Sequence, residues 1–257
     1  MAWTLRTGPD LLQRNNSNLF HTMDVCTMWR SPCGALRPDN AGIPFTETSQ
    51  RMHITADSLS PEATYRLLSG VVVPRPIAWI TTLNEEGVVN LAPFSCFTFV
   101  SNKPPMLGVN IGRKRGTRKD TGANIHAMRE FVVNIGHSGQ LHAIHESSVE
   151  HAPDVSEAEL LGLATAPSTT VRTPRLLDAP VAMECRLDRV IEFGSTGAEF
   201  IVGEITVFHL RDGLYRDGKV QTTELDPVCR IGGPNYATLG EIVTLRAVPQ
   251  TAKAEMP

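Results

Sequence analysis

The sequence predicts a mainly β fold with a few short helices, in which antiparallel strands form a barrel. Apolar, β-branched runs dominate the chain from about residue 52 to residue 248, and turn signals separate them. These runs do not alternate regularly with helical segments, as the strands of a doubly wound parallel sheet would. We therefore favour an antiparallel barrel, and we find no internal repeat.

The first half of this region supplies a helix and five strands. Residues 58–62 combine an N-cap pattern with a proline in the first turn, which predicts a short helix that runs to Leu68. Turn residues at 84–87 and 102–105 then divide the apolar segments. We expect strands over residues 77–83, 88–91, 94–100, 106–111 and 131–135.

The second half supplies further strands and the remaining helices. Apolar residues at 181, 183, 185 and 187 alternate with residues 182, 184, 186 and 188, which predicts a strand with one dry and one wet face. Another strand is expected over residues 200–210, before the Asp212-Gly213 turn. Helices are expected over residues 120–129, 138–147 and 156–161.

Three parts are expected along the chain. Residues 1–51 show no sustained hydrophobic period, so they predict a disordered N-terminal extension or a mis-called start, with Met52 as the initiator. Five arginines without a lysine in this segment hint at a mitochondrial presequence, but its acidic residues weaken that interpretation. Residues 52–248 are expected to form the folded domain, and residues 249–257 a flexible C-terminal tail.

Composition excludes several classes of protein. Hydrophobic residues make up 41% of the 257 residues, enough for a sizeable core, and no apolar run reaches the ~18 residues of a membrane span. A formal net charge of −3 argues against a nucleic-acid partner. The five cysteines include no CxxC pair, which fits a reducing compartment. We expect a cytoplasmic protein, with a mitochondrial location as the minority alternative.

A basic segment carries the clearest chemical signal. Residues 113–119 hold five cations in seven positions, after an expected strand and before an expected helix. Backbone N–H groups at a helix start, together with cationic side chains, favour a bound anion such as a phosphate. A solvated basic loop or a nuclear-localisation-like patch would give the same pattern.

The histidines at 137, 142, 145 and 151 raise the question of a metal site. No carboxylate or cysteine completes a recognisable ligand set around them, so we predict no metal and interpret these side chains as surface or capping histidines.

Seven short motifs follow one another along the chain, and their order and spacing together indicate a family. They are PRPIAWITT at 74–82, NLAPFSCF at 90–97, VSNKPP at 100–105, KDTGANI at 119–125, EFVVN at 130–134, PVAMEC at 180–185 and RIGGPNY at 230–236. In this order and spacing, residues from about 58 to 248 resemble the flavin reductase-like family, which includes the flavoredoxin-like proteins. The resemblance implies an FMN-binding split β-barrel of Greek-key type. Cys96 and Thr98 depart from the family pattern near the expected flavin ring.

The resemblance also implies where FMN would bind. It places Lys119 and Thr121 at the phosphate and the flavin ring against the segment 93–95, and Arg113 is a second candidate for the phosphate. Arg113 could instead be a solvent-facing arginine. Arg75 is the nearest candidate cation for the flavin ring but could be a fixed surface arginine, and Trp79 is more simply a core residue than a stacking platform for the ring. The candidate cofactor-binding residues are Arg75, Thr81, Asn90, Pro93, Ser95, Cys96, Arg113, Lys119, Thr121 and Tyr236.

The activity implied by the resemblance is that of an NAD(P)H-dependent flavin oxidoreductase. Hydride would pass from NADH or NADPH through bound FMN to a free flavin or another small acceptor, and no catalytic residue is nominated because the cofactor carries that chemistry. A non-catalytic FMN-binding module or a flavoredoxin-like electron carrier is the alternative. The resemblance further implies a homodimer with flavin sites at or near the subunit interface. A nucleic-acid module is disfavoured because aromatic residues do not accompany the basic segment.

Overall fold

The computed structural model describes residues 52–248, and all of the elements below belong to the unit that begins at Ile54. The expectations for residues 1–51 and for the C-terminal tail lie outside the described part of the chain. Within residues 52–248, no helix is long and apolar enough to cross a membrane.

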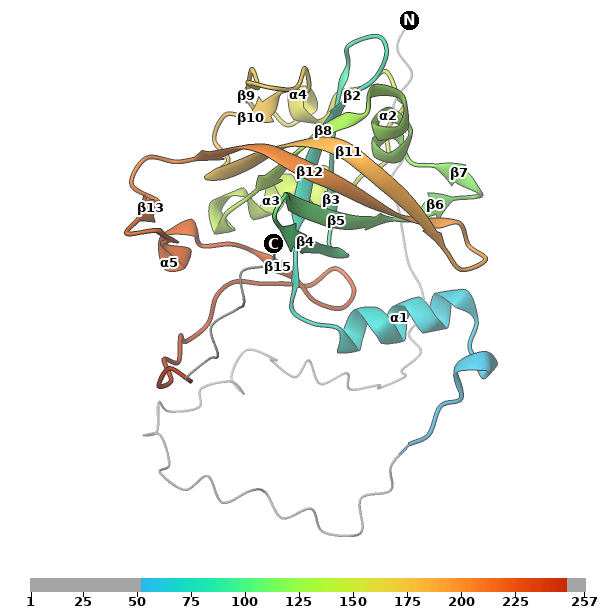
Figure 1. Ribbon diagram of the computed structural model, residues 1–257. Coiled ribbons are helices and arrows are strands. Elements are labelled where there is room, and N and C mark those ends of the chain that lie inside the picture. Colours follow the sequence, from blue (N-terminus) through green and yellow to red (C-terminus); the bar gives the residue numbers. More distant parts are fainter. Residues whose placement is uncertain (1–51, 249–257) are drawn as a thin grey trace, which may run out of the picture. The chain divides into compact units, whose positions relative to one another are not determined.

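One antiparallel sheet of seven strands forms the main body (Figure 1). Its strand order is β3-β2-β8-β11-β12-β5-β4, so the β11–β12 hairpin inserts between β5 and β8 in the manner of a Greek key. The strands are β2 (Ala78–Leu83), β3 (Val89–Phe94), β4 (Phe97–Asn102), β5 (Pro105–Ile111), β8 (Glu130–Ile135), β11 (Val181–Phe193) and β12 (Ala198–Leu210).

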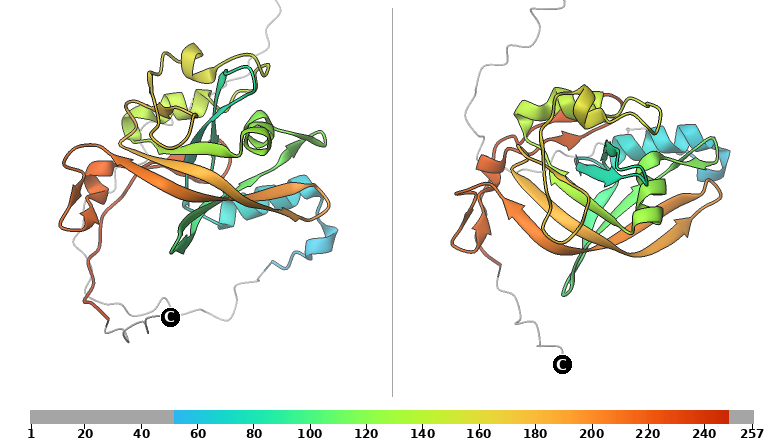
Figure 2. Two further views of the ribbon diagram at one scale, coloured as in Figure 1. Left: turned by 45° about the horizontal axis from the view of Figure 1, so that its top comes forward. Right: turned by 90° about the horizontal axis from the view of Figure 1, so that it is seen from above.

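The two edges of this sheet are close together in the sequence. Only Ser95 and Cys96 separate the edge strand β3 from the edge strand β4, so the sheet must curl until its edges approach each other. Figure 2 shows this curvature, with the long β11–β12 hairpin sweeping around the other strands. No ladder pairs β3 with β4 in residues 52–248, and the barrel is therefore split.

Short helices and short strands surround the barrel. The helices are α1 (Pro61–Val71), α2 (Asp120–Met128), α3 (Leu141–Glu146), α4 (Glu157–Leu160) and α5 (Thr222–Leu225), with 3₁₀ turns at Ala56–Ser58 and Ser138–Gln140. The short strands are β1 (Arg75–Pro76), β15 (Cys229–Arg230) and β16 (Tyr236–Ala237) in one small sheet, and the pairs β6 (Arg113–Lys114) with β7 (Thr117–Arg118), β9 (Thr165–Ala166) with β10 (Arg175–Leu176), and β13 (Tyr215–Arg216) with β14 (Lys219–Val220).

Two clusters of buried side chains hold the layers together. Alternate residues from Ile77, which precedes β2, into β2 itself face opposite sides of the sheet. Ala78 and Ile80 therefore pack inside the barrel, while Ile77 and Trp79 pack against its outer layer. Trp79 is fully buried, and its Nε1 donates to Ser147 Oγ at 2.9 Å. This placement confirms that Trp79 is a core residue.

The expected helix starts are largely correct, and several boundaries move. Ser60 caps α1, because its Oγ accepts from the backbone N–H of Ala63 at 3.2 Å, and this helix continues beyond Leu68 to Val71. The single strand expected over 94–100 is wrong, because the chain turns at residues 95–96 and β4 begins at Phe97. The pairing of Arg113 and Lys114 with the segment at 117–118 was not anticipated.

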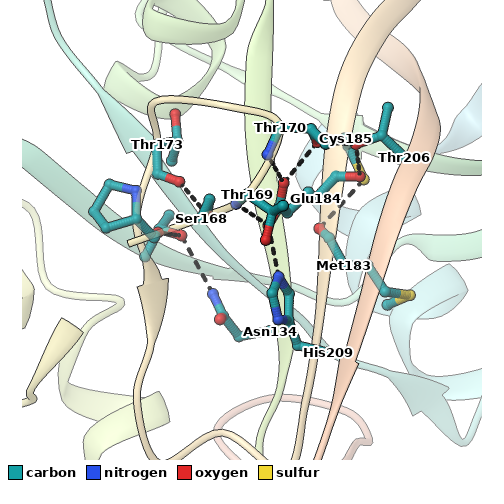
Figure 3. A network of polar contacts seen from close by, with 12 residues as sticks. Asn134, Ser168, Thr169, Thr170, Thr173, Met183, Glu184, Cys185, Thr206 and His209 are labelled. Carbon is teal, nitrogen blue, oxygen red and sulfur yellow. Dashed lines mark hydrogen bonds and ion pairs between the residues drawn. The ribbon is translucent and has the colours of Figure 1, made fainter. Parts of the chain in front are cut away.

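The expected wet face of β11 is wrong over half of its length. Arg186 and Asp188 are exposed, but Ala182 and Glu184 are 1% and 0% exposed. Residues 168–173 cover them, and Figure 3 shows the Glu184 carboxylate between this segment and His209. Glu184 can be buried because each of its two carboxylate oxygens lies within hydrogen-bonding distance of two donors.

Candidate functional site

Two adjoining pockets lie where β3 ends. The Lys119 pocket, about 360 Å³, is lined by residues from β3, the β6–β7 hairpin, the start of α2 and the segment 147–157. The Arg75 pocket, about 390 Å³, is lined by residues from α1, β1 and the β15–β16 region. Both have Pro93, Phe94 and Ser148 in their walls, so the two pockets adjoin each other at the end of β3.

The start of α2 faces the Lys119 pocket. Lys119 is the N-cap with an extended backbone (φ −68°, ψ 156°), and Asp120 and Thr121 open the helix, where backbone N–H groups have no partner within the helix. Asp120 is the first helical residue, and no side chain caps the start of α2. Lys119 Nζ lies 5.9 Å from the centre of the Phe94 ring, and no carboxylate of residues 52–248 forms an ion pair with it.

A buried polar chain forms the floor of the Lys119 pocket. Thr121 Oγ1 donates to Asn90 Oδ1 at 2.8 Å, and Asn90 Nδ2 lies 3.1 Å from both carboxylate oxygens of Glu157. The backbone N–H of Leu91 donates to the same carboxylate at 2.8 Å. Thr121, Asn90 and Glu157 are 1%, 8% and 5% exposed, so these hydrogen bonds satisfy groups that water cannot reach. Sequence reasoning missed Glu157, which lies 67 residues from Asn90.

Two of the five cations in the basic segment, Arg113 and Arg118, hold the β6–β7 hairpin in place. The guanidinium groups of Arg113 and Arg118 lie 3.0 and 2.8 Å from the buried carboxylate of Glu199, and His126 Nε2 lies 3.1 Å from it. The hydrogen bond from Arg118, helped by His126, holds the pKa of Glu199 below its ordinary value although burial alone would raise it. Arg113 does not line the Lys119 pocket, whereas Lys119 and Thr121 do.

Arg75 is built into the wall of the other pocket. Its side chain is 8% exposed, and its Nη1 donates to the carbonyl oxygens of Ser69 and Val72 at 2.6 and 2.7 Å. Its Nη2 donates to the carbonyl oxygen of Ile231 at 3.2 Å, and its Nε to Ser95 Oγ at 3.3 Å. Arg75 thus joins the end of α1 to β3 and to the segment after β15, and it is not a freely moving surface cation.

Tyr236 forms the opposite wall of the Arg75 pocket. Its hydroxyl accepts from Arg230 Nη1 and lies 3.1 Å from His145 Nδ1, while the central carbon of the Arg230 guanidinium lies 4.5 Å from the centre of the ring. Burial raises the pKa of the Tyr236 phenol, and the nearby Arg230 only partly opposes this effect. The phenol is therefore protonated at neutral pH.

Two other candidate residues line neither pocket. Thr81 is 0% exposed, and its Oγ1 donates to the carbonyl oxygen of Pro174 at 2.7 Å. The Cys96 side chain is exposed, while its carbonyl oxygen accepts from the backbone N–H of Asn110 at 2.8 Å. The candidates therefore divide between the Lys119 pocket (Asn90, Pro93, Lys119, Thr121) and the Arg75 pocket (Arg75, Pro93, Ser95, Tyr236).

Two of the four histidines singled out in the sequence, His137 and His145, have hydrogen-bond partners. His137 Nδ1 accepts from the backbone N–H of Gly139 at 3.1 Å and caps the 3₁₀ turn that follows, which confirms a capping role for this residue. In the part of the chain that the structure describes, no group of three or more His, Cys, Asp or Glu side chains could hold a metal ion.

The split antiparallel barrel and its two pockets can now be compared with known proteins. A flavin reductase like domain matches residues 69–224, more than half of the chain. This chain therefore belongs to the flavin reductase-like family, which confirms the resemblance found in the motifs.

Solved structures of relatives have the same architecture. Nitrilotriacetate monooxygenase component B from Bacillus cereus is 36% identical, with a TM-score of 0.75, and the match covers 77% of this chain and all of that one. The 2-nitrobenzoate 2-nitroreductase NbaA of Pseudomonas fluorescens is 34% identical, with a TM-score of 0.70, over 79% of this chain and all of its own. A split-barrel protein from Shewanella frigidimarina NCIMB 400, at 21% identity, a TM-score of 0.68 and coverage of 77% and 100%, supports the fold alone.

Proposed function

We propose that this protein binds FMN and uses it to transfer hydride from NADH or NADPH to a free flavin or another small acceptor. The observation that carries this proposal is the pair of adjoining pockets in which a lysine without an ion-pair partner, at a helix start, lies near an apolar wall at Pro93 and Phe94. An amphipathic anion with a phosphate at one end and a flat ring at the other matches this arrangement.

The chemistry of the donors fits a phosphate at the Lys119 end. Lys119 supplies a charge, and the backbone N–H groups at the start of α2 supply directed donors. The hydroxyl of Thr121 already donates to Asn90, so Thr121 would contribute through its backbone and by keeping the pocket floor rigid. Glu157 in turn fixes the orientation of the Asn90 amide, because only the Nδ2 group can donate to a carboxylate.

The ring would lie along the wall formed by residues 93–95. Pro93 and Phe94 offer apolar surface, and Ser95, whose Oγ accepts from Arg75 Nε, retains a hydroxyl proton to donate. When bound, the flavin supplies two-electron chemistry, taking a hydride from a nicotinamide and passing two electrons to an acceptor. The residues of this chain bind, orient and shield it, and none has to act as an acid or base.

The test begins with the colour of the purified protein. A flavin absorption spectrum, with FMN identified chromatographically after denaturation, is the expected result. Anaerobic mixing with NADH or NADPH should then bleach the flavin, and air or free flavin should restore the colour. Bound FMN that neither nicotinamide bleaches would favour the alternative, a non-catalytic FMN-binding module or a flavoredoxin-like electron carrier.

We also propose that the protein acts as a homodimer. The helix α1 has no buried residue, and apolar side chains are exposed both on α1, where Tyr65 and Val71 are each 66% exposed, and on the edge strand β4, where Phe99 is 79% exposed. Exposed apolar groups and an unpaired strand edge are features that a two-fold partner would cover.

A further inference from the structure

The Arg75 pocket has an unbalanced charge. Three arginines are among its lining residues, Arg66, Arg75 and Arg230, and no aspartate or glutamate is. The Lys119 pocket, in contrast, combines four lysines and arginines with three carboxylates. Arg66 is neutralised by an exposed ion pair with Glu62, which leaves Arg75 and Arg230 as the cations to explain.

Arg75 is a buried cation without a counter-ion. No carboxylate of residues 52–248 forms an ion pair with it, and its hydrogen bonds go to three carbonyl oxygens and one hydroxyl. These bonds use four of its five N–H donors and satisfy its geometry, but they do not neutralise its charge. A buried charge is costly unless an opposite charge compensates it, so this wall of the pocket favours an anionic occupant.

Arg230 is placed to contact that occupant directly. Its Nε and Nη2 donate to the carbonyl oxygen of Gly233 at 3.0 and 2.7 Å, and one Nη1 proton goes to the Tyr236 hydroxyl. Two of its five N–H donors remain, one on each terminal nitrogen, which is the pattern that a carboxylate accepts in two parallel bonds. The central carbon of the guanidinium also lies 4.5 Å from the centre of the Tyr236 ring, and this contact and the hydrogen bond to the Tyr236 hydroxyl hold the Arg230 side chain against Tyr236.

The remaining walls are flat and apolar. The rings of Tyr65, Phe94 and Tyr236 and the side chain of Ile77 line the same cavity. A volume of about 390 Å³ suits a molecule of one or two rings, whereas a whole nicotinamide dinucleotide is larger. Aromatic and aliphatic walls beside a guanidinium that has no carboxylate partner favour an aromatic molecule that carries an anionic group.

We propose that the part of the Arg75 pocket lined by Arg230 and Tyr236 binds the second substrate of this flavoenzyme, an aromatic carboxylate held by Arg230 beside the flavin ring, which would occupy the side of the same pocket at residues 93–95. The role as a substrate pocket rests on the proposed function, but the binding of an aromatic anion does not. The positive charge of Arg75 in the pocket wall favours an anionic ligand without binding it directly, and the hydrogen bond to Tyr236 keeps Arg230 in position.

Calorimetric titration of the full-length, FMN-loaded protein with benzoate and with benzamide tests the proposal. The two probes share a shape and differ in charge, so benzoate should bind at least about ten-fold more tightly. Arg230→Gln should remove that advantage while leaving the affinities for benzamide and FMN unchanged. Arg216→Gln, which removes an arginine of β13 outside both pockets, is the matched control and should change nothing.

Each other outcome has a definite meaning. Equal affinity for benzoate and benzamide, or unchanged benzoate affinity in Arg230→Gln, would overturn the proposal. Loss of FMN affinity in this variant would also overturn it, because the pocket would then belong to the cofactor. If Arg230→Gln does not fold, Arg230→Lys keeps the charge without the paired donors and should give intermediate benzoate affinity. A wild-type protein that binds benzoate through Arg230 but no FMN would contradict the proposed function and leave the anion site standing.

Discussion

The hydroxyl of Thr121 donates to the side-chain oxygen of Asn90 at 2.8 Å, across a separation of 31 residues. This bond ties the first turn of α2 to β3, and both side chains are buried. Because Glu157 fixes the Asn90 amide, the Asn90 oxygen must point toward Thr121, and the hydroxyl proton of Thr121 is committed. The position of the helix start that faces the proposed phosphate site therefore depends on an internal hydrogen bond.

Replacing Thr121 by valine tests this dependence. Valine has nearly the same shape but no hydroxyl, so the buried Asn90 oxygen would retain only the Thr82 hydroxyl at 3.4 Å. We expect the free energy of unfolding to fall by about 1–2 kcal/mol, as for other buried acceptors that lose a partner. Thr121→Ser keeps the hydroxyl and should cost less. Urea denaturation of both variants measures the difference, and equal losses would show that the hydroxyl contributes nothing.

Removing the charge of Lys119 should weaken FMN binding without unfolding the protein. One charge-assisted hydrogen bond contributes about 1.5–3 kcal/mol, so Lys119→Ala should lower the affinity about 10- to 150-fold. Lys219→Ala removes the same charge from β14, outside both pockets, and serves as the control. Quenching of flavin fluorescence reports both affinities. Unchanged FMN affinity in Lys119→Ala would exclude this pocket as the phosphate site.

Local patterns in the sequence identified most strands, the N-terminal cap of α1 and the family. They could not identify pairings that join distant segments. Glu157 opens a short helix and looks like a solvent-facing acid, and its burial depends on Asn90, 67 residues away. Arg113 looks like a phosphate ligand in a basic run, but its partner Glu199 lies on β12. In both cases the decisive information is which side chains meet after folding.

The prediction of a solvent-exposed face on β11 was partly wrong for a related reason. A period of two shows which side chains share a face, but not whether a loop covers that face. Residues 168–173 place two backbone N–H groups and a hydroxyl around Glu184, so this carboxylate is buried with its hydrogen bonds satisfied (Figure 3). The covering segment lies 11–16 residues before Glu184 in the chain and has no periodic signal of its own.

The buried Glu184 should make stability depend on acid pH. Burial by itself would raise the pKa of this carboxyl, but hydrogen bonds from the Thr170 hydroxyl, His209 and the backbone N–H groups of Thr169 and Thr170 outweigh it. They hold the pKa at about 2, against 4.5 for an ordinary glutamate. Because the folded-state pKa is depressed, the stabilisation is complete above pH 4.5 and is lost as the pH falls toward 2.

The size of this effect follows from the same values. The free energy of unfolding should fall by about 3 kcal/mol across that interval for Glu184 alone. Glu184→Gln should remove this part of the pH dependence, whereas Glu204→Gln, at an exposed position of β12, should retain it. Urea denaturation at a series of pH values provides the comparison. A Glu184→Gln protein with the wild-type acid profile would contradict the assignment.

Gly203 permits close packing inside the barrel. A Cβ atom at this position of β12 would lie 2.5 Å from the ring of Phe131 and 3.2 Å from Cys185 Cβ, and Phe131 is only 1% exposed. Gly203→Ala should therefore destabilise the protein by about 1–3 kcal/mol through overpacking. Gly70→Ala in α1, where a Cβ would meet nothing within 4 Å, should instead stabilise by about 0.5–1 kcal/mol. Opposite shifts in melting temperature are expected, and a neutral Gly203→Ala would show that the barrel core relaxes easily.

The proposed homodimer predicts that assembly and FMN binding are linked. If flavin sites lie at or near the subunit interface, FMN should strengthen the dimer, because a ligand that binds only the assembled form shifts the equilibrium toward it. Phe99 is the most exposed of the apolar side chains considered above, on the edge strand β4, so Phe99→Glu should favour the monomer and lower FMN affinity together. Phe193→Glu changes another exposed phenylalanine, 56% exposed at the end of β11, and is the control. Sedimentation velocity of the apo and FMN-loaded proteins at low concentration measures the equilibrium. A monomer that keeps full FMN affinity would contradict both the dimer and the shared site.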